Sequence, residues 1–396
     1  MKKLLIIGAS ILQLPAIQKA KDMGFYVGVV DYNPNAVGVP LADSFFCVST
    51  IDVEGVVKVA EAFRPDGIMT LATDMPMRSI AAACEKLGLP GISRETAVKS
   101  TDKGEMIKAF EKNGVEHPWY YLLSSPEELD RVADKITYPC ISKPTDNAGS
   151  RGVMLIQSGQ QLRDAVLYSS QNGRSGSVIV EEYMRGQEVS VEMMITDGQP
   201  HVLQVTDKLT TGAPHFVEMG HHQPSMLSPS DLDKIRDLAC RAVKAVGIEN
   251  GPAHVEIMLT ENGPKMVELG ARMGGDCITT HLVPLSTGID MIEATIRIAC
   301  GEKPDLEPKW KKGSAIRFLD APCGVITAIE GADQAETIEG VREICFTKQI
   351  GDTVSEIGSS TDRAGFVIAQ ADTAKEAVAV CDSAMERITL SVQESC

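Results

Sequence analysis

Apolar runs and amphipathic stretches alternate along the first hundred residues. Short apolar runs are typical of buried strands, whereas apolar residues three or four positions apart, such as Leu14, Ile17 and Ala20, predict helices. The predicted strands lie at residues 4–7, 26–30, 45–48 and 67–71, and the predicted helices at 14–24, 53–63 and 75–87. Strands that alternate with helices predict a parallel sheet with helices on its faces.

The pattern changes after residue 97. Residues 98–118 predict a helix followed by an extended segment at Pro118. Strands and glycine-rich turns follow at 138–142, 153–156, 178–182 and 188–195, and helices return at 230–246 and 289–300. The proline-containing segment 301–313 lacks periodicity, which is typical of a boundary. Beyond it, a strand-rich stretch to residue 370 precedes a closing helix at 373–388.

This order of elements predicts an α/β protein whose central part is α+β. We expect an N-terminal Rossmann-like domain with a parallel sheet at residues 1–97, a central domain at 98–300 and a small C-terminal α/β domain at 301–396. The first turn does not match a dinucleotide-binding loop, because Ser10 and Gln13 stand where G-x-G-x-x-G requires glycine. NAD is therefore disfavoured, although Asp31 ends the second strand.

Composition and charge limit the classes of molecule that this protein is expected to bind. The 54 acidic residues outnumber the 38 basic ones and give a formal charge of −16, so we expect no nucleic-acid partner, although a few lysines can still bind a small phosphate. Ten cysteines without a CxxC pair predict reduced thiols, and no stretch approaches the ~18 apolar residues of a membrane span. We expect a cytoplasmic protein without membrane contact. The oligomeric state stays open, with a homodimer as one option.

A loop of small residues follows the strand that ends in Lys143. The chain turns back through Gly149 and Ser150 into another strand, not into a helix. Small side chains let backbone N–H groups approach phosphate oxygens, and the lysine adds a positive charge. No G-K-[ST] follows the glycines, which excludes a Walker loop. The alternative is a plain hairpin with a solvated lysine.

Carboxylates also end the strand predicted at 178–182. Glu181 and Glu182 precede Tyr183 and Met184, and Glu188 follows after a turn. This strand end could offer backbone groups to a purine, and Glu188 could contact ribose hydroxyls. A polar strand end without a ligand explains the same pattern.

The strongest pattern is a hairpin with two carboxylates. Residues 253–259 and 265–269 predict two strands around a turn at 261–264. A two-residue Asn-Gly turn would place Glu256 and Glu268 on opposite faces, whereas an odd-length loop sets them directly across from each other, ~5 Å apart. Pro264 favours the odd-length loop, because a ladder that begins there lacks a donor. That register also gathers the apolar residues on the other face, namely Val255, Ile257, Leu259, Val267 and Leu269.

Two opposed carboxylates repel each other unless a cation lies between them. Oxygen-only ligands suit Mg²⁺, which commonly takes one or two carboxylates and completes its shell with phosphate and water; Mn²⁺ is an alternative. Alternation along the strand puts Arg272 on the face of Glu268. The competing interpretation is an acidic sheet that faces solvent.

In their order and spacing, these motifs resemble the ATP-grasp ligases over nearly the whole chain. The resemblance implies an ATP-grasp fold at 98–300 with a lid subdomain at about 118–182. It further implies ATP at Lys103, Lys143, Gly149, Ser150, Glu181, Glu182, Met184 and Glu188, and Mg²⁺ at Glu256 and Glu268. Gly270 stands where many members of the superfamily have asparagine, so water would replace one metal ligand.

Within that superfamily, residues 221–225 and 268–276 are most similar to the L-amino acid ligases, which form dipeptides. The similarity implies catalytic roles for Arg272 and Lys143, and places His221 or His222 beside an acyl phosphate. Adjacent residues of a strand point to opposite faces, so only one of the histidines reaches the site. A zinc site of His215, His221 and His222 is disfavoured because no fourth ligand has suitable spacing.

The function that we expect is an ATP-dependent, ADP-forming carboxylate–amine ligase that works through an acyl phosphate and joins an amino acid to an amine or a second amino acid. One alternative is a biotin carboxylase or carbamoyl-phosphate-type enzyme, although residues 204–211 lack the Arg/Gln-rich stretch of biotin carboxylases. Another is a purine-pathway ligase that acts on phosphoribosyl substrates. An inactive nucleotide-binding regulator would be expected to lack a metal carboxylate or a phosphate lysine, and this chain has both.

Overall fold

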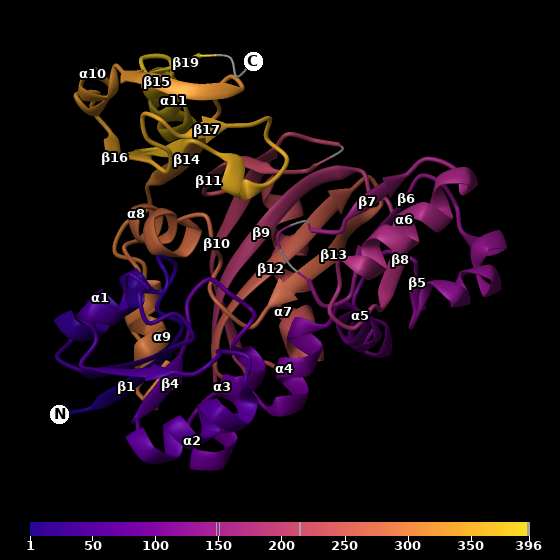
Figure 1. The fold of residues 1–396 in the computed structure, drawn as a ribbon, viewed down its shortest axis with the longest axis horizontal. Helices are drawn as coiled ribbons and strands as arrows, with labels where there is room; N and C mark the ends of the chain where they lie inside the picture. The colour runs from indigo at the N-terminus through magenta and orange to yellow at the C-terminus, as the bar shows by residue number, and fades with distance from the viewer. Residues whose placement is uncertain (148, 150, 214, 394–396) are drawn as a thin grey trace.

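The computed structural model describes residues 1–147, 149, 151–213 and 215–393 (Figure 1). Its N-terminal part is a four-stranded parallel sheet in the order β3-β2-β1-β4, as the alternating pattern predicts. The strands are β1 (Lys3–Ile7), β2 (Tyr26–Asp31), β3 (Ser44–Cys47) and β4 (Gly67–Met69). The helices are α1 (Leu14–Asp22), α2 (Val53–Phe63) and α3 (Met77–Leu87), with a 3-10 turn at Val39–Leu41.

Helices cover both faces of this sheet, which explains why β1 is a continuous apolar run. Leu5 and Ile7 pack with Val56 of α2 and Ile80 of α3, whereas Leu4 and Ile6 face the other way. The second face is covered by α1 and by α9 (Met291–Ala299), a helix that follows nearly two hundred residues later in the chain. The N-terminal sheet is therefore locked to the rest of the protein by apolar packing.

The single helix predicted at 98–118 is wrong. Two helices, α4 (Arg94–Thr101) and α5 (Lys103–Lys112), meet at Asp102, whose backbone is extended and whose carboxylate accepts the Glu105 backbone N–H. Asp102 thus ends α4 and caps α5. The break places Lys103 in the first turn of α5.

A small antiparallel sheet projects to one side of the molecule, in the order β5-β8-β6-β7 (Figure 1). Its elements are β5 (Tyr120–Leu123), two 3-10 turns (Pro126–Arg131 and Ala133–Lys135), β6 (Cys140–Pro144), β7 (Met154–Ile156), α6 (Gly159–Gln171) and β8 (Val178–Glu182). Helix α6 was not predicted, because only Leu162, Ala165 and Val166 mark its apolar stripe. These elements fall within the range expected for the lid, whose bounds stay a prediction.

An eight-stranded antiparallel sheet forms the centre of the structure, in the order β13-β12-β9-β10-β11-β14-β18-β16. The central strands are β9 (Gly186–Thr196), β10 (Gln199–Thr210), β11 (Glu218–Gln223), β12 (Gly251–Thr260) and β13 (Gly263–Gly270). The helix α7 (Pro229–Val246) buries Ile235, Leu238 and Val243 against one face of these strands. The opposite face is free to carry polar side chains.

The C-terminal region continues the central sheet. Its strands β14 (Gly313–Leu319), β16 (Val341–Phe346) and β18 (Gly365–Ala371) extend the sheet beyond β11, and α11 (Ala374–Met385) packs on β14 and β18. Before them lie a π-helical turn (Ile278–Leu282) and α8 (Val283–Thr287). The remaining elements are β15 (Gly324–Glu330), α10 (Ala332–Glu336), β17 (Thr353–Val354), a 3-10 turn at Ser360–Asp362 and β19 (Thr389–Gln393).

The β12–β13 hairpin pairs Glu256 with Glu268, as predicted, but the strand register that pairs them arises in a different way. The turn is a two-residue one, with Thr260 opposite Gly263, and a β-bulge between Glu256 and Ile257 then shifts the register by one residue. The expectations of an odd-length loop and of Val267 in the apolar face are therefore wrong. Met266 pairs with Ile257 and enters the core in place of Val267.

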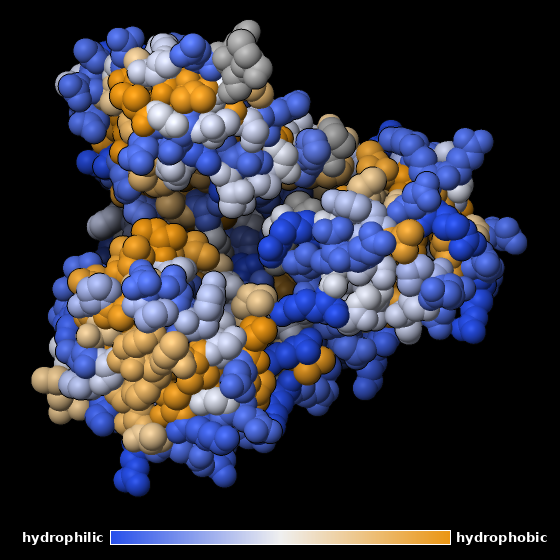
Figure 2. Space-filling view, in the orientation of Figure 1, coloured by the Kyte–Doolittle hydropathy of each residue, from blue (hydrophilic) through white to orange (hydrophobic). Residues whose placement is uncertain are grey.

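Three lobes surround a hollow, and the space-filling view shows hydrophilic residues where they meet (Figure 2). The N-terminal sheet, the small antiparallel sheet and the C-terminal strands form the lobes (Figure 1). Within the described residues, no helix has the length and apolar character that a bilayer crossing requires.

Candidate active site

One face of the central sheet carries a continuous band of polar side chains. Glu256 on β12 lies opposite Ser190 on β9 and Glu268 on β13, and Lys208 on β10 lies opposite His221 on β11. Because alternate residues of a strand share a face, the band runs across five strands. We call it the polar band; its members are Glu188, Ser190, Glu192, Thr206, Lys208, His221, Gln223, His254, Glu256 and Glu268.

Two lysines neutralise the opposed carboxylates of the polar band. Lys103 Nζ lies 3.0 Å from Glu268 Oε2, and Lys208 Nζ lies 3.3 Å from Glu256 Oε2. Burial alone would raise the pKa of both carboxyl groups, but the lysine charges outweigh it and hold the pKa of Glu256 well below, and that of Glu268 below, the usual value. Both groups are therefore ionised carboxylates at neutral pH.

Glu256 and Glu268 fit a hard divalent cation. They present only oxygen atoms, face each other across one strand pair, and stay charged, which is the donor chemistry that Mg²⁺ and Mn²⁺ prefer. Within the described residues no group of three or more His, Cys, Asp or Glu could hold a metal. A cation at this pair would therefore complete its shell with substrate oxygens or water.

A buried ion pair lies beneath Glu256. His254 Nδ1 is 2.8 Å from Glu192 Oε1, and its Nε2 is 3.2 Å from Glu256 Oε1. Burial lowers the pKa of His254, but the charge and hydrogen bond of Glu192 dominate and raise this pKa to about 9. The imidazolium donates to both carboxylates and fixes the direction in which Glu256 points.

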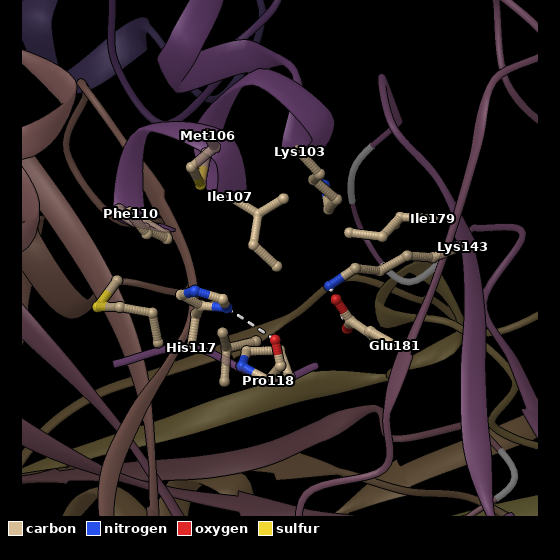
Figure 3. A pocket seen from close by; sticks show the side chains of 11 residues that line it. Lys103, Met106, Ile107, Phe110, His117, Pro118, Lys143, Ile179 and Glu181 are labelled. Atoms are coloured by element: carbon tan, nitrogen blue, oxygen red, sulfur yellow. Dashed lines mark hydrogen bonds and ion pairs between the residues drawn. The ribbon is translucent and has the colours of Figure 1, made fainter. Parts of the chain in front are cut away.

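A pocket beside α5 has charged and apolar walls (Figure 3). Lys143 Nζ and Glu181 Oε1 are 2.6 Å apart on neighbouring strands of the small sheet, and both side chains are largely buried. The other lining residues are Lys103, Met106, Ile107, Phe110, His117, Pro118, Ile179, Met266 and Val267. Because the bulge turns the side chain of Val267 away from the core, Val267 lines this pocket. Apolar side chains together with lysines suit a nucleotide base and its phosphates.

The predicted phosphate loop is tied to Lys103. The Lys103 backbone N–H donates to Thr145 O, and its Nζ donates to Asn147 O at 2.8 Å. Gly149 has φ +68°, and apart from its two chain neighbours no atom of the described residues would lie within 4 Å of a Cβ there. Ser150, also predicted here, lies outside the described residues.

The remaining residues expected at the nucleotide lie along the link from β8 to β9. Glu182 Oε2 accepts from Lys265 Nζ at 2.7 Å, and Met184 is buried. Glu188 Oε1 accepts from Lys208 Nζ at 2.6 Å, which connects the expected ribose carboxylate to the polar band.

Arg272 is held by the N-terminal domain. Its Nε lies 3.1 Å from Asp74 Oδ1, and its Nη2 lies 3.0 Å from Asp74 Oδ2, in the loop after β4. Burial acts to lower the pKa of Arg272, but the charge and hydrogen bond of Asp74 and the charges of Glu256 and Glu268 outweigh it and raise that pKa. Asp276, four residues after Arg272, does not pair with it; its carboxylate accepts from Arg363 instead.

Of the two adjacent histidines, only His221 belongs to the polar band. Its Nε2 lies 3.3 Å from Asp276 Oδ2. His222 points to the other face of β11, where its Nε2 lies 2.9 Å from Asp207 Oδ2. The prediction of His222 as a site residue is therefore not supported by its position. His215, the third histidine of the disfavoured zinc set, is exposed.

Several residues of the site were not predicted. Lys208, His254, Glu192 and Asp74 contact expected site residues but belong to no motif in the sequence. Strand alternation could have found Lys208, because it shares a face with Thr206 on a strand that is otherwise free of lysine. Asp74 follows a parallel strand, an edge where ligand-binding residues gather.

Comparison with known proteins agrees with this geometry. Residues 136–280 match the ATP-grasp domain, and residues 317–393 match the L-amino acid ligase C-terminal domain 2. The chain thus carries an ATP-grasp domain and, after it, the C-terminal domain of L-amino acid ligases. It is an enzyme of the class that joins a carboxylate to an amine at the expense of ATP.

The relatives include ligases named for amino-acid substrates and also a ligase named for a phosphoribosyl substrate, which is one of the predicted alternatives. The chain is 28% identical to alanine–anticapsin ligase of Bacillus subtilis over 323 residues, which cover 75% of this chain and 67% of the relative. It is 26% identical to phosphoribosylamine–glycine ligase of Methanosarcina barkeri, over 94% of this chain and 89% of that one. The fold matches that of L-amino acid ligase from Bacillus licheniformis with a TM-score of 0.85 at 21% identity, over 100% of this chain and 99% of that one.

We predict that Lys143→Ala lowers turnover by ~10²-fold or more, because it removes a positive charge from the nucleotide pocket. The same change leaves Glu181 buried without its partner, so Lys143→Met combined with Glu181→Gln is the cleaner variant. Kinetics and nucleotide titration measure the effect, and Lys58→Ala, at an exposed lysine of α2, is the control. Wild-type turnover and affinity in the double variant would favour the plain hairpin.

We predict that Arg272→Lys lowers turnover by ~10²-fold with ATP affinity and melting temperature nearly unchanged, because an ammonium cannot make two-point contact with a carboxylate. Asp74→Asn tests the structural interpretation, since it breaks the same pair from the other side. If Arg272 only joins the two domains, both variants should lower the melting temperature alike, and activity should follow the folded fraction.

Proposed function

We propose that this ligase joins two amino acids, or an amino acid and another amine, through an acyl phosphate. The Arg272–Asp74 pair is the observation that carries the proposal. A guanidinium and a carboxylate side by side match the carboxylate and the ammonium group of an amino acid. The pair borders the polar band, where the reacting carboxylate must meet the terminal phosphate of ATP.

In this proposal ATP lies in the pocket beside α5. Lys143 and Lys103 contact its phosphates, and the apolar residues Met106, Ile107 and Val267 contact the base. Glu188, already held by Lys208, turns toward the ribose. Thr145 and Asn147, which accept from Lys103, hold the start of the expected phosphate loop beside this pocket.

Glu256 and Glu268 would hold Mg²⁺, with Mn²⁺ as a substitute. A cation held by these two carboxylates would supply positive charge that neutralises the phosphates of ATP. Lys103 and Lys208 then turn from these carboxylates toward phosphate oxygens. His254 keeps Glu256 oriented throughout.

The chemistry has two steps. A carboxylate oxygen of the first substrate attacks the γ-phosphorus, and ADP leaves with the electrons of the broken bond. The amine of the second substrate then attacks the acyl carbon, loses a proton, and phosphate leaves. Arg272 and Lys143 stabilise the charge on the acyl phosphate, so catalysis depends on positioning and electrostatics.

A phosphoribosyl substrate is the second candidate, favoured by the long match to phosphoribosylamine–glycine ligase. Such a substrate needs a basic pocket for its own phosphate. Arg363 already commits both Nη groups to Asp276, and Arg272 is assigned to the acyl phosphate, so neither guanidinium is left for a second phosphate. The amino-acid proposal therefore stands first.

A substrate screen tests the proposal. Release of ADP and phosphate should be measured with all pairs of the common amino acids, and peptide products should be identified by mass. Bicarbonate alone, and glycine with ribose 5-phosphate and ammonia, are the competing arms. Turnover in a competing arm without turnover on amino-acid pairs would overturn the proposal, and no turnover in any arm would favour the inactive regulator.

The metal assignment gives a separate prediction. Glu268→Gln keeps the shape of the side chain but removes one of the two charges that would hold the cation, so we expect turnover to fall by ~10²-fold or more with little loss of stability. Glu302→Gln removes a carboxylate of similar exposure that pairs with Lys2 and Arg297 outside the polar band, and serves as the control. Magnesium titration by calorimetry with ADP present should show weakened metal binding only in the Glu268 variant. A wild-type rate at limiting Mg²⁺ would contradict the assignment.

A further inference from the structure

A second arginine–carboxylate pair lies beside the polar band, and its arginine comes from the C-terminal region. Arg363 Nη2 donates to Asp276 Oδ1 at 2.7 Å, and its Nη1 donates to Asp276 Oδ2 at 2.9 Å. The guanidinium also stacks on the ring of Phe318, 3.6 Å from the ring centroid. Asp276 Oδ2 lies 3.3 Å from Nε2 of His221. Segments far apart in the sequence thus meet at one histidine of the site.

The hydrogen bonds of the two arginines indicate different tasks. A guanidinium has five N–H groups. Arg363 commits four of them within the protein, because Nε donates to Ser360 O and Nη1 donates to Glu218 O besides the two bonds to Asp276. Arg272 commits three, two to Asp74 and one to Met273 O, and keeps more capacity for a substrate. Arg363 therefore serves to hold other groups.

Asp276 needs to be held. Asp276 and Cys277 have φ of +50° and +60°, a left-handed conformation that costs free energy in residues other than glycine. The two-point contact from Arg363 fixes the Asp276 carboxylate in this strained turn and keeps it ionised. Burial acts to raise the pKa of Asp276, but the hydrogen bonds of Arg363 and His221 outweigh it and lower that pKa.

An ionised carboxylate can only accept hydrogen bonds. Nε2 of His221 must therefore carry a proton and donate the hydrogen bond that Asp276 accepts. In the neutral ring Nδ1 is then an acceptor. That atom is buried and has no hydrogen-bond partner among the described residues. His221 is almost fully buried, with its ring roughly perpendicular to that of Phe318 and with Lys208 across the strand pair. Nδ1 is thus an acceptor beside the polar band that lacks a donor.

We propose that Arg363 is a positioning residue of the active site: through Asp276 it fixes His221 with the proton on Nε2, so that Nδ1 accepts an N–H of the incoming amine. Only the role of Nδ1 rests on the proposed function. The arrangement Arg363–Asp276–His221 exists without substrate and can be tested without turnover.

The first test observes the tautomer in the absence of substrates. The protein is labelled with ¹⁵N-histidine, and the His221 ring signals are assigned by their loss in His221→Gln. We expect a single Nε2–H tautomer in the wild type and a mixture of tautomers in Arg363→Lys. Arg317→Lys is the matched control, because Arg317 is equally buried and pairs with Asp382 on the other face of the sheet. A wild-type Nδ1–H tautomer, or unchanged signals in Arg363→Lys, would overturn the proposal.

The second test measures ligation per ADP released, on the amino-acid pair with the highest turnover. A misdirected His221 still permits phosphorylation but slows aminolysis, so Arg363→Lys should lose ~10–100-fold in ligation rate and release more ADP per peptide formed. A purely structural Arg363 predicts an unchanged ratio and a rate that follows the folded fraction. If Arg363→Lys does not fold, Asp276→Asn gives the same readouts, because it removes the carboxylate that requires Nε2–H. If the wild type ligates nothing, the proposed function fails while the tautomer test still decides this inference.

Discussion

The opposition of Glu256 and Glu268 is the constraint on which the site depends. At the ~5 Å spacing of a cross-strand pair, two charges repel by about 3 kcal/mol in a medium of effective dielectric constant ~20. A lysine 3.0 Å from a carboxylate attracts it by about 5 kcal/mol on the same scale. The pair is therefore stable only while cations stay beside it. Lys103 and Lys208 meet this need in the protein alone, and a metal ion would take over as they turn to phosphates.

This requirement explains why the site draws on separate regions of the chain. Lys103 comes from the first turn of α5, Lys208 from β10, and the carboxylates from the β12–β13 hairpin. The N-terminal domain contributes Asp74, which pairs with Arg272. The C-terminal region contributes Arg363, which pairs with Asp276. The apolar packing of α9 on the N-terminal sheet and the continuation of the central sheet into β14 fix these regions relative to one another. Precision at the site thus follows from packing far from it.

The periodicity of apolar residues predicted most helices and strands correctly. It predicted less well which residues pair with one another across neighbouring strands. The parallel N-terminal sheet and the opposition of Glu256 and Glu268 followed from alternation, which one hydrophobic face specifies. The bulge could not be foreseen, because Met266 and Val267 are both apolar and either could face the core. Contacts such as Arg272–Asp74 join residues about two hundred positions apart, and no local pattern encodes them. The break at Asp102 was readable, since Asp three residues before Glu105 is a helix-capping pattern.

The same alternation lets one sheet combine stability with chemistry. On β9, Val189, Val191 and Met193 pack under α7, whereas Ser190 and Glu192 between them join the polar band. Burying charges such as His254 and Glu192 costs free energy that their attraction does not reliably return, so this band contributes little to folding. The apolar face supplies the stability that the polar face lacks. A substitution on the α7 side should therefore act through the folded fraction, and one on the polar side through the chemistry, even when the two residues are neighbours in the chain.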